Sequence, residues 1–182
     1  MSVRLPRTSG RALTTLISLI GLLAATVGVT AAAPVSARFP PYGTDPVTVQ
    51  RSPQPPPKAI DLRPGEHRNF DRVVIDLRGK IPGYDVRYVR RLVYDGSGDP
   101  VPLRGRRFIA VALNPASAHD RNGNNLYVGP RLRQLQMPSL RGVAFTGDFE
   151  GVVSFGLSLS HRAPFRVFTL SAPSRIVIDL RH

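Results

Sequence analysis

Aliphatic and polar residues alternate along several stretches of the chain beyond residue 66. The apolar residues at every second position are Val73, Ile75 and Leu77; Ile109, Val111 and Leu113; Val153, Phe155, Leu157 and Leu159; and Ile176, Ile178 and Leu180. A period of two places these side chains on one face of an extended strand. No window carries a sustained 3.6-residue stripe, so the pattern predicts strands and no amphipathic helix.

Turn-forming residues separate these strands. Clusters of Gly, Pro, Asn, Asp and Ser lie at residues 81–83, 95–99, 122–124, 146–148 and 172–174. Between these turns the chain has room for about eight or nine short strands. Because a sheet with one apolar face must bury that face against another layer, the sequence predicts an all-β sandwich or barrel.

One heptapeptide occurs twice. Residues 72–78 read RVVIDLR and residues 175–181 read RIVIDLR, so six of seven positions are identical at a separation of 103 residues. In each copy three aliphatic residues share one face, and Arg, Val, Asp and Arg share the other. Chance similarity between two amphipathic strands is one interpretation. The other is internal pseudo-symmetry, with the copies in equivalent places of two related sheets.

The first 37 residues have the features of a secretory signal peptide. Arg4, Arg7 and Arg11 precede an apolar stretch at residues 12–29, and small residues at 35–37 favour cleavage before Arg38. About 18 apolar residues can also just span a bilayer, so an uncleaved membrane anchor is the alternative. We therefore predict a secreted or envelope-associated protein that contacts the membrane only if this segment is retained.

A proline-rich segment follows the predicted signal peptide. Residues 34–64 contain nine of the 18 prolines, including the run PQPPP at 53–57. Proline lacks an N–H group and favours extended polyproline geometry, which disfavours helices and interior strands. This composition predicts a flexible spacer over residues 38–65, followed by one domain over residues 66–182.

Arginine makes the chain strongly basic. There are 25 basic and 12 acidic residues, a net charge of +13, and only Lys58 and Lys80 are lysines. Removal of residues 1–37 takes away three arginines and no acidic residue, which leaves +10. For an exported protein the polyanions within reach are cell-wall polymers, anionic lipids and acidic glycans, so we expect no nucleic-acid partner. A solvated basic surface without a partner is the alternative.

Residues suited to catalysis or metal binding are sparse. The chain has no cysteine, and the spacing of His67, His119, His161 and His182 matches no metal motif. A wall hydrolase using Asp148, Glu150 and His161 is the catalytic alternative. A turn aspartate bonded to its own backbone, beside a solvated glutamate, explains the carboxylates equally well. The sequence therefore predicts a protein that is not an enzyme and that needs no cofactor or metal.

Two strand faces are candidates for binding. The first is a cationic face made of Arg87, Tyr88, Arg90, Arg91, Arg106 and Arg107, which could also be a solvated rim that protects a sheet edge. The second is a flat side of the strand at residues 152–160, lined by Val152, Ser154, Gly156, Ser158 and Ser160. It could admit a glycan strand or let another layer pack closely.

Several segments, in order, resemble the AMIN-like domain family. They are FDRVVIDLRG at 70–79, PGYDV at 82–86, FEGVVSFGL at 149–157, PFRV at 164–167 and RIVIDL at 175–180. The resemblance covers about residues 67–182 and implies a β-sandwich of two related sheets. AMIN domains proper are exported, non-catalytic modules that direct amidases and secretion or pilus machinery to peptidoglycan.

The resemblance has limits. AMIN-like proteins of high-GC Gram-positive bacteria include lipoproteins, but this chain has no lipobox cysteine and no attached amidase domain. The family motif supplies no ligand residues. We interpret the chain as an exported, non-catalytic envelope module that binds peptidoglycan or anionic wall polymer through the Arg/Tyr face. An adaptor subunit of an envelope protein complex is the alternative, and an exposed apolar patch would indicate it.

Overall fold

A computed structural model describes residues 39–182, which form one compact unit. Ten antiparallel strands in two sheets make up the fold, which confirms the predicted all-β sandwich. Among residues 39–182 no helix is long and apolar enough to cross a membrane. The predicted signal peptide lies outside the described residues.

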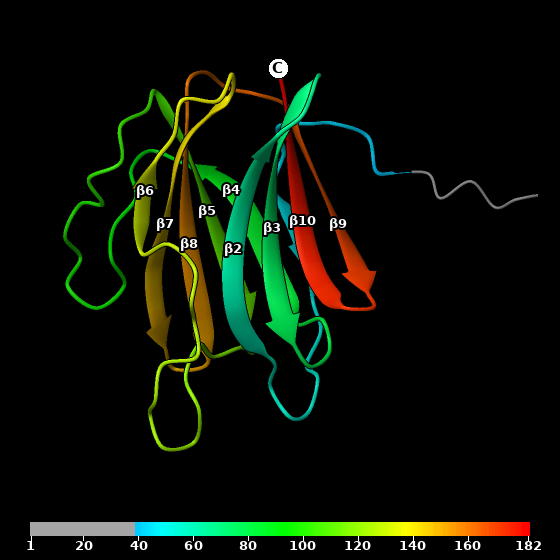
Figure 1. Cartoon of the computed structure of the whole chain (residues 1–182), viewed down its shortest axis with the longest axis vertical. Coiled ribbons are helices and arrows are strands. Elements are labelled where there is room, and N and C mark those ends of the chain that lie inside the picture. The colour runs from blue at the N-terminus through cyan, green and yellow to red at the C-terminus, as the bar shows by residue number, and fades with distance from the viewer. Residues whose placement is uncertain (1–38) are drawn as a thin grey trace, which may run out of the picture. The chain divides into compact units, whose positions relative to one another are not determined.

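The two sheets lie face to face (Figure 1). In spatial order, the six-stranded sheet contains β1 (Val47–Val49), β4 (Gly83–Val89), β5 (Arg107–Asn114), β8 (Val152–Leu159), β7 (Leu140–Phe149) and β6 (Leu132–Gln134). The four-stranded sheet contains β2 (Lys58–Glu66), β3 (Phe70–Arg78), β10 (Ser174–Arg181) and β9 (Phe165–Ser171). All named pairings are antiparallel.

The alternating apolar residues form the core between the sheets. Ile75, Ile109, Phe155 and Ile178 are all 0–1% exposed and belong to one hydrophobic cluster. Burying a side chain of this size contributes roughly 1.5–3 kcal/mol relative to exposing it. The period-two pattern therefore identified the inward face of each long strand correctly.

The two heptapeptide copies are neighbours in one sheet, so their expected placement in two related sheets is wrong. β3 and β10 pair antiparallel, with Val74 opposite Val177 at the centre of the pairing. This register places Arg72 opposite Asp179 and Asp76 opposite Arg175. The repeat thus builds a local two-fold arrangement in which the first residue of one copy meets the fifth of the other.

A buried ionic cluster covers the outer face of the four-stranded sheet. The carboxylate of Asp179 is fully buried and accepts two hydrogen bonds from Arg72 and two from Arg166. These bonds raise the pKa of Arg72. Four aromatic rings lie within cation–π distance of the two guanidinium groups, and they belong to Phe39, Tyr42, Phe70 and Phe168.

The expected spacer at residues 38–65 belongs instead to the sandwich, so the domain boundary at residue 66 is wrong. β1 and most of β2 lie in this segment, and Gly43 exchanges backbone hydrogen bonds with Phe165. Both β1 and β2 are edge strands. An edge strand leaves one side of its backbone unpaired, so it tolerates proline residues such as Pro64.

Tyr127 closes one end of the core. Its ring packs against Phe145 and Phe155, and its hydroxyl donates a hydrogen bond to the carbonyl of Pro130. Burial raises the pKa of Tyr127 above the ordinary tyrosine value, because a phenolate would be poorly solvated there. In the unfolded chain the same group ionises near pH 10.

This difference predicts a loss of stability at high pH. The contribution of Tyr127 is complete below about pH 10 and declines by roughly 1.4 kcal/mol per pH unit above it, because only the unfolded chain loses the proton. Urea unfolding between pH 9 and 11.5 measures the decline. Tyr127→Phe should show a shallower decline than the parent protein, and equal declines would contradict the assignment to Tyr127.

Candidate functional site

The predicted cationic face divides into two parts in the structure. Tyr88, Arg90, Arg106 and Arg107 line one cavity of about 390 Å³, together with Arg162. Arg87 and Arg91 line a different depression on the outer face of the six-stranded sheet. The division follows from strand geometry, because Arg87 and Tyr88 are consecutive in β4 and point to opposite faces.

Tyr88 is a wall of its cavity rather than a free stacking platform. Its hydroxyl donates a 2.6 Å hydrogen bond to the carbonyl of Ala163, and its ring packs edge-on against Phe165. The guanidinium carbon of Arg162 lies 4.5 Å from the ring centre. Burial raises the pKa of Tyr88, so its hydroxyl stays protonated. The ring therefore orients Arg162 at the cavity rim.

A second cavity of about 640 Å³ adjoins the first and shares Arg106 with it. Arg104 and Arg141 contribute two further guanidinium groups, and Gln134 and Gln136 contribute amides. We call the two cavities together the arginine groove, defined by Arg90, Arg104, Arg106, Arg107, Arg141 and Arg162. The groove lies near the end of the sandwich where β8 finishes (Figure 1).

Backbone contacts hold the arginine-bearing segments in place. The amide of Arg106 donates a 2.7 Å hydrogen bond to the carbonyl of Leu159 at the end of β8. Gln134 on β6 accepts from the amide of Arg104 and donates to the carbonyl of Pro102. The chain before β5 is thus attached both to the middle of the sheet and to its edge, which positions its arginines.

The positive charge of the groove is not neutralised within the domain. None of its six arginines forms an ion pair with an acidic side chain of residues 39–182. Neither cavity has an acidic residue in its lining. Guanidinium groups form paired hydrogen bonds with phosphate and carboxylate, so this arrangement suits an extended polyanion.

Arg87 and Arg91 lie in a mixed-charge environment. Arg87 is within 3.3 Å of the carboxylate of Asp85, and both arginines line their depression with Asp85 and Asp95. The nearby carboxylates reduce the local positive potential. These two members of the predicted face are therefore weaker candidates for an anion site than Arg106 and Arg162.

The middle of the flat small-residue side of β8, at Gly156 and Ser158, is covered by protein. A Cβ atom added to Gly156 would lie 2.7 Å from the side chain of Leu92, and Ser158 is fully buried. Leu92, Val101 and Leu103 belong to a second small hydrophobic cluster with Ala144. The segment before β5 thus packs on the middle of this side, which confirms close packing at Gly156 and Ser158, whereas Ser154 and Ser160 are half-buried.

The residues of the hydrolase hypothesis do not converge. Asp148 pairs with Val153 near the β7–β8 turn, whereas His161 follows the far end of β8. β8 continues for six residues beyond Val153, about 20 Å at the rise of a β-strand, before the chain reaches His161. Glu150 is exposed at the tip of the turn, with a φ of 48°. These three side chains cannot act on one bond.

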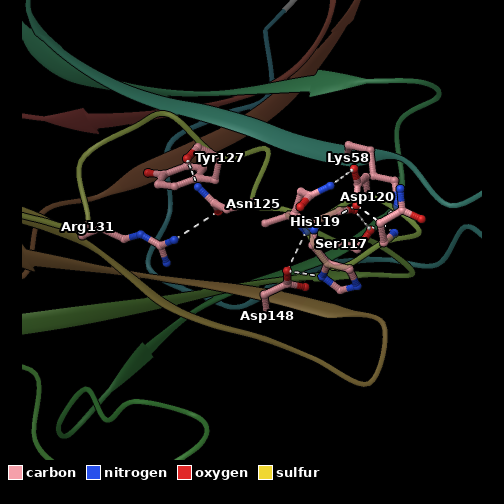
Figure 2. Close-up of polar contacts among 11 residues, drawn as sticks. Lys58, Ser117, His119, Asp120, Asn125, Tyr127, Arg131 and Asp148 are labelled. Carbon is pink, nitrogen blue, oxygen red and sulfur yellow. Dashed lines mark hydrogen bonds and ion pairs between the residues drawn. The ribbon is translucent and has the colours of Figure 1, made fainter.

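Asp148 instead holds a loop, as Figure 2 shows. Its Oδ2 accepts a hydrogen bond from the amide of Ala118 and lies 2.6 Å from Nδ1 of His119. The hydroxyl of Ser117 contacts Lys58 and the backbone carbonyl of His119, not the histidine ring. The cluster therefore lacks the serine–histidine contact of a nucleophilic triad.

Sequence reasoning missed Arg141 and Arg162 as members of the groove. Arg141 lies in β7, and Arg162 lies in the loop between β8 and β9. Neither has a distinctive local motif, and both join the site only because β5 pairs with β8, which pairs with β7. Only these strand pairings could have identified Arg141 and Arg162 as members of the groove.

Large exposed hydrophobic side chains are dispersed over the described residues. They are Phe39 near the start of the unit, Val128 in a loop, Leu132 on β6, Phe149 at the end of β7 and Leu170 on β9. They come from five separate segments. An adaptor role stays a prediction.

Comparison with known proteins identifies one family. A sequence model described as an AMIN-like domain matches residues 57–182. No curated protein and no solved structure matches the chain. The matched residues include all the strands except β1 and all six arginines of the groove.

Proposed function

The chain belongs to the AMIN-like domain family, and on that premise we propose that it is an exported cell-envelope module whose arginine groove binds an anionic cell-wall polymer. AMIN-like domains are in general extracytoplasmic and non-catalytic, and the family relates to peptidoglycan. The observation that carries the proposal is the set of six arginines lining two adjoining cavities with no acidic residue among their linings.

The shape and charge of the groove support a polymer rather than a single small anion. The two cavities have volumes of about 640 and 390 Å³ and are joined through Arg106. A chain with repeated phosphate or carboxylate groups can contact several guanidinium groups at once, which increases affinity through multiple weak contacts. Arg133 is exposed and Arg175 is half-buried, and both lie outside the two cavities, so they can serve as controls for charge alone.

Sedimentation with insoluble wall sacculi tests the proposal. We expect the protein to bind sacculi that retain their anionic polymers and to lose binding when those polymers are removed. Binding should also weaken as salt rises from 50 to 500 mM, because the screening length falls to a few ångströms. Binding that survives polymer removal would contradict the proposed ligand and assign the interaction to peptidoglycan itself.

A pair of charge-matched variants assigns the binding to the groove. Changing Arg104, Arg106, Arg107 and Arg162 together to glutamine should weaken binding about 100-fold, roughly 0.7 kcal/mol per exposed arginine. The control variant carries the same change at Arg87, Arg91, Arg133 and Arg175, outside the groove. Equal weakening in both variants would mean that only net charge matters.

A further inference from the structure

A cavity of about 670 Å³ lies at the other end of the sandwich, where β2 begins and β3 ends (Figure 1). Its lining comes from three segments and consists of Gln54, Pro55, Pro56, Lys58, Arg78, Gly79, Lys80 and Arg121. Its volume falls within the range of small-molecule sites. It shares no lining residue with the arginine groove.

Four cations surround this cavity, and its lining contains no acidic residue. Lys58 and Arg78 are direct cross-strand partners in the β2–β3 pairing, an arrangement in which like charges destabilise a sheet. Within residues 39–182 none of the four cations forms an ion pair. A bound anion would relieve the repulsion between these charges.

Lys58 is held in position by a neighbouring loop. Its ammonium group donates a 2.6 Å hydrogen bond to the hydroxyl of Ser117, as Figure 2 shows. That hydroxyl can donate in turn to the carbonyl of His119, 3.4 Å away. An ammonium group has three donors, so two remain for a ligand. This fixation lowers the entropy cost of anion binding.

The wall formed by Pro55, Pro56 and Gly79 adds an apolar surface beside the cations. The prolines carry no N–H donor that would need a partner. Gly79 has a φ of 109° and a position where an added Cβ would lie 3.3 Å from Pro57, so a side chain there would be strained. Because Gly79 has no side chain, it leaves the cavity open on this side.

We propose that this cavity binds a phosphate ester that carries an apolar group. A phosphate monoester carries two charges and three free oxygens, so it can bond to several of the four cations at once. A singly charged carboxylate can engage fewer of them. The proline rings would contact the attached apolar group. This site is separate from the polymer groove in residues, position and ligand class.

The lysine content of the chain permits a selective test. Lys58 and Lys80 are its only lysines, and both line the cavity. Biosynthetic incorporation of lysine labelled with ¹³C at Cε marks both residues in the full chain and leaves their ammonium groups and N–H donors unmodified. Lys58→Arg and Lys80→Arg assign the two lysine signals in the NMR spectrum. Hexyl phosphate should shift both signals with a Kd at least tenfold below that of inorganic phosphate.

Three comparisons decide the outcome. Hexanol at the same concentration should shift neither signal, and hexanoate should bind more weakly than hexyl phosphate. Arg78→Gln/Arg121→Gln should weaken hexyl phosphate binding at least tenfold, whereas the charge-matched Arg133→Gln/Arg175→Gln, outside every cavity named above, should leave it unchanged. Equal affinity for inorganic phosphate and hexyl phosphate, or equal loss in both double variants, would overturn the proposal.

A vesicle experiment identifies the natural source of the ester. Additional broadening of the lysine signals by vesicles containing phosphatidic acid, absent with pure phosphatidylcholine vesicles, would identify a lipid headgroup as the ligand. A response to hexyl phosphate without a vesicle response would identify a soluble ester. The ligand-free spectrum of each variant should retain the parent pattern, which confirms that the variants are folded.

Discussion

Replacing Asp179 by alanine is expected to lower the free energy of unfolding by about 4 kcal/mol, because it leaves two arginines beneath an aromatic layer without their shared partner. The carboxylate is fully buried, and its hydrogen bonds to Arg72 and Arg166 are 2.6–2.9 Å long. The Tyr42 and Phe168 rings cover these guanidinium groups, which limits access of water to them. Urea unfolding at neutral pH measures the loss.

The heptapeptide repeat offers a matched control at Asp76. It occupies the same position in the other copy, but its side chain is 24% exposed and that of its partner Arg63 is 54% exposed. Exposed ion pairs contribute at most about 1 kcal/mol, so Asp76→Ala should cost that much or less. A similar loss in both variants would show that the aromatic cover of Asp179 has no energetic role.

Replacing Asp71 by alanine should cost about 3 kcal/mol, the second large effect. Its Oδ2 accepts hydrogen bonds from the backbone amides of Ser139 and Leu140, at 2.8 and 2.7 Å. Its Oδ1 lies 3.0 Å from Nε2 of His182. Because Asp71, Ser139 and Leu140 are fully buried, the alanine variant leaves two amides without an acceptor, each costing roughly 1–3 kcal/mol.

Two milder variants separate the contributions at this site. Asp71→Asn keeps an acceptor oxygen for the two amides and should cost less than half as much as the alanine variant. His182→Ala removes only the partly exposed partner and should cost about 1 kcal/mol or less. Chemical unfolding of all three proteins under one condition gives the comparison. If His182→Ala matched Asp71→Ala, the terminal contact rather than amide capping would stabilise the structure.

The strands and their inward faces were predictable because alternation along a strand is a local property. Val73 and Ile75 face the core whichever strand lies beside them, since successive side chains point to opposite faces. The partner of each strand is a non-local property. The same heptapeptide fits two places in one sheet or one place in each of two sheets, and only the folded chain distinguishes these arrangements.

The proline-rich segment shows a different limit of sequence reasoning. Proline composition indicates that a segment is a poor interior strand, but it does not exclude an edge position. β1 and β2 each lie at an edge of their sheet, and Gly43 bonds to Phe165 more than 100 residues away. Because of these long-range contacts, a segment whose composition is typical of linkers forms part of the sandwich.

By itself, the sequence determined the all-β class, the core-facing residues, the basic character and the family. These properties follow from local periodicity, residue counts and ordered motifs. Tertiary structure alone decided which arginines lie together. Pairing of β5 with β8 and of β8 with β7 gathers Arg106, Arg141 and Arg162, while strand alternation separates Arg87 from Tyr88. A binding surface is defined by distance in space, and distance along the chain does not specify it.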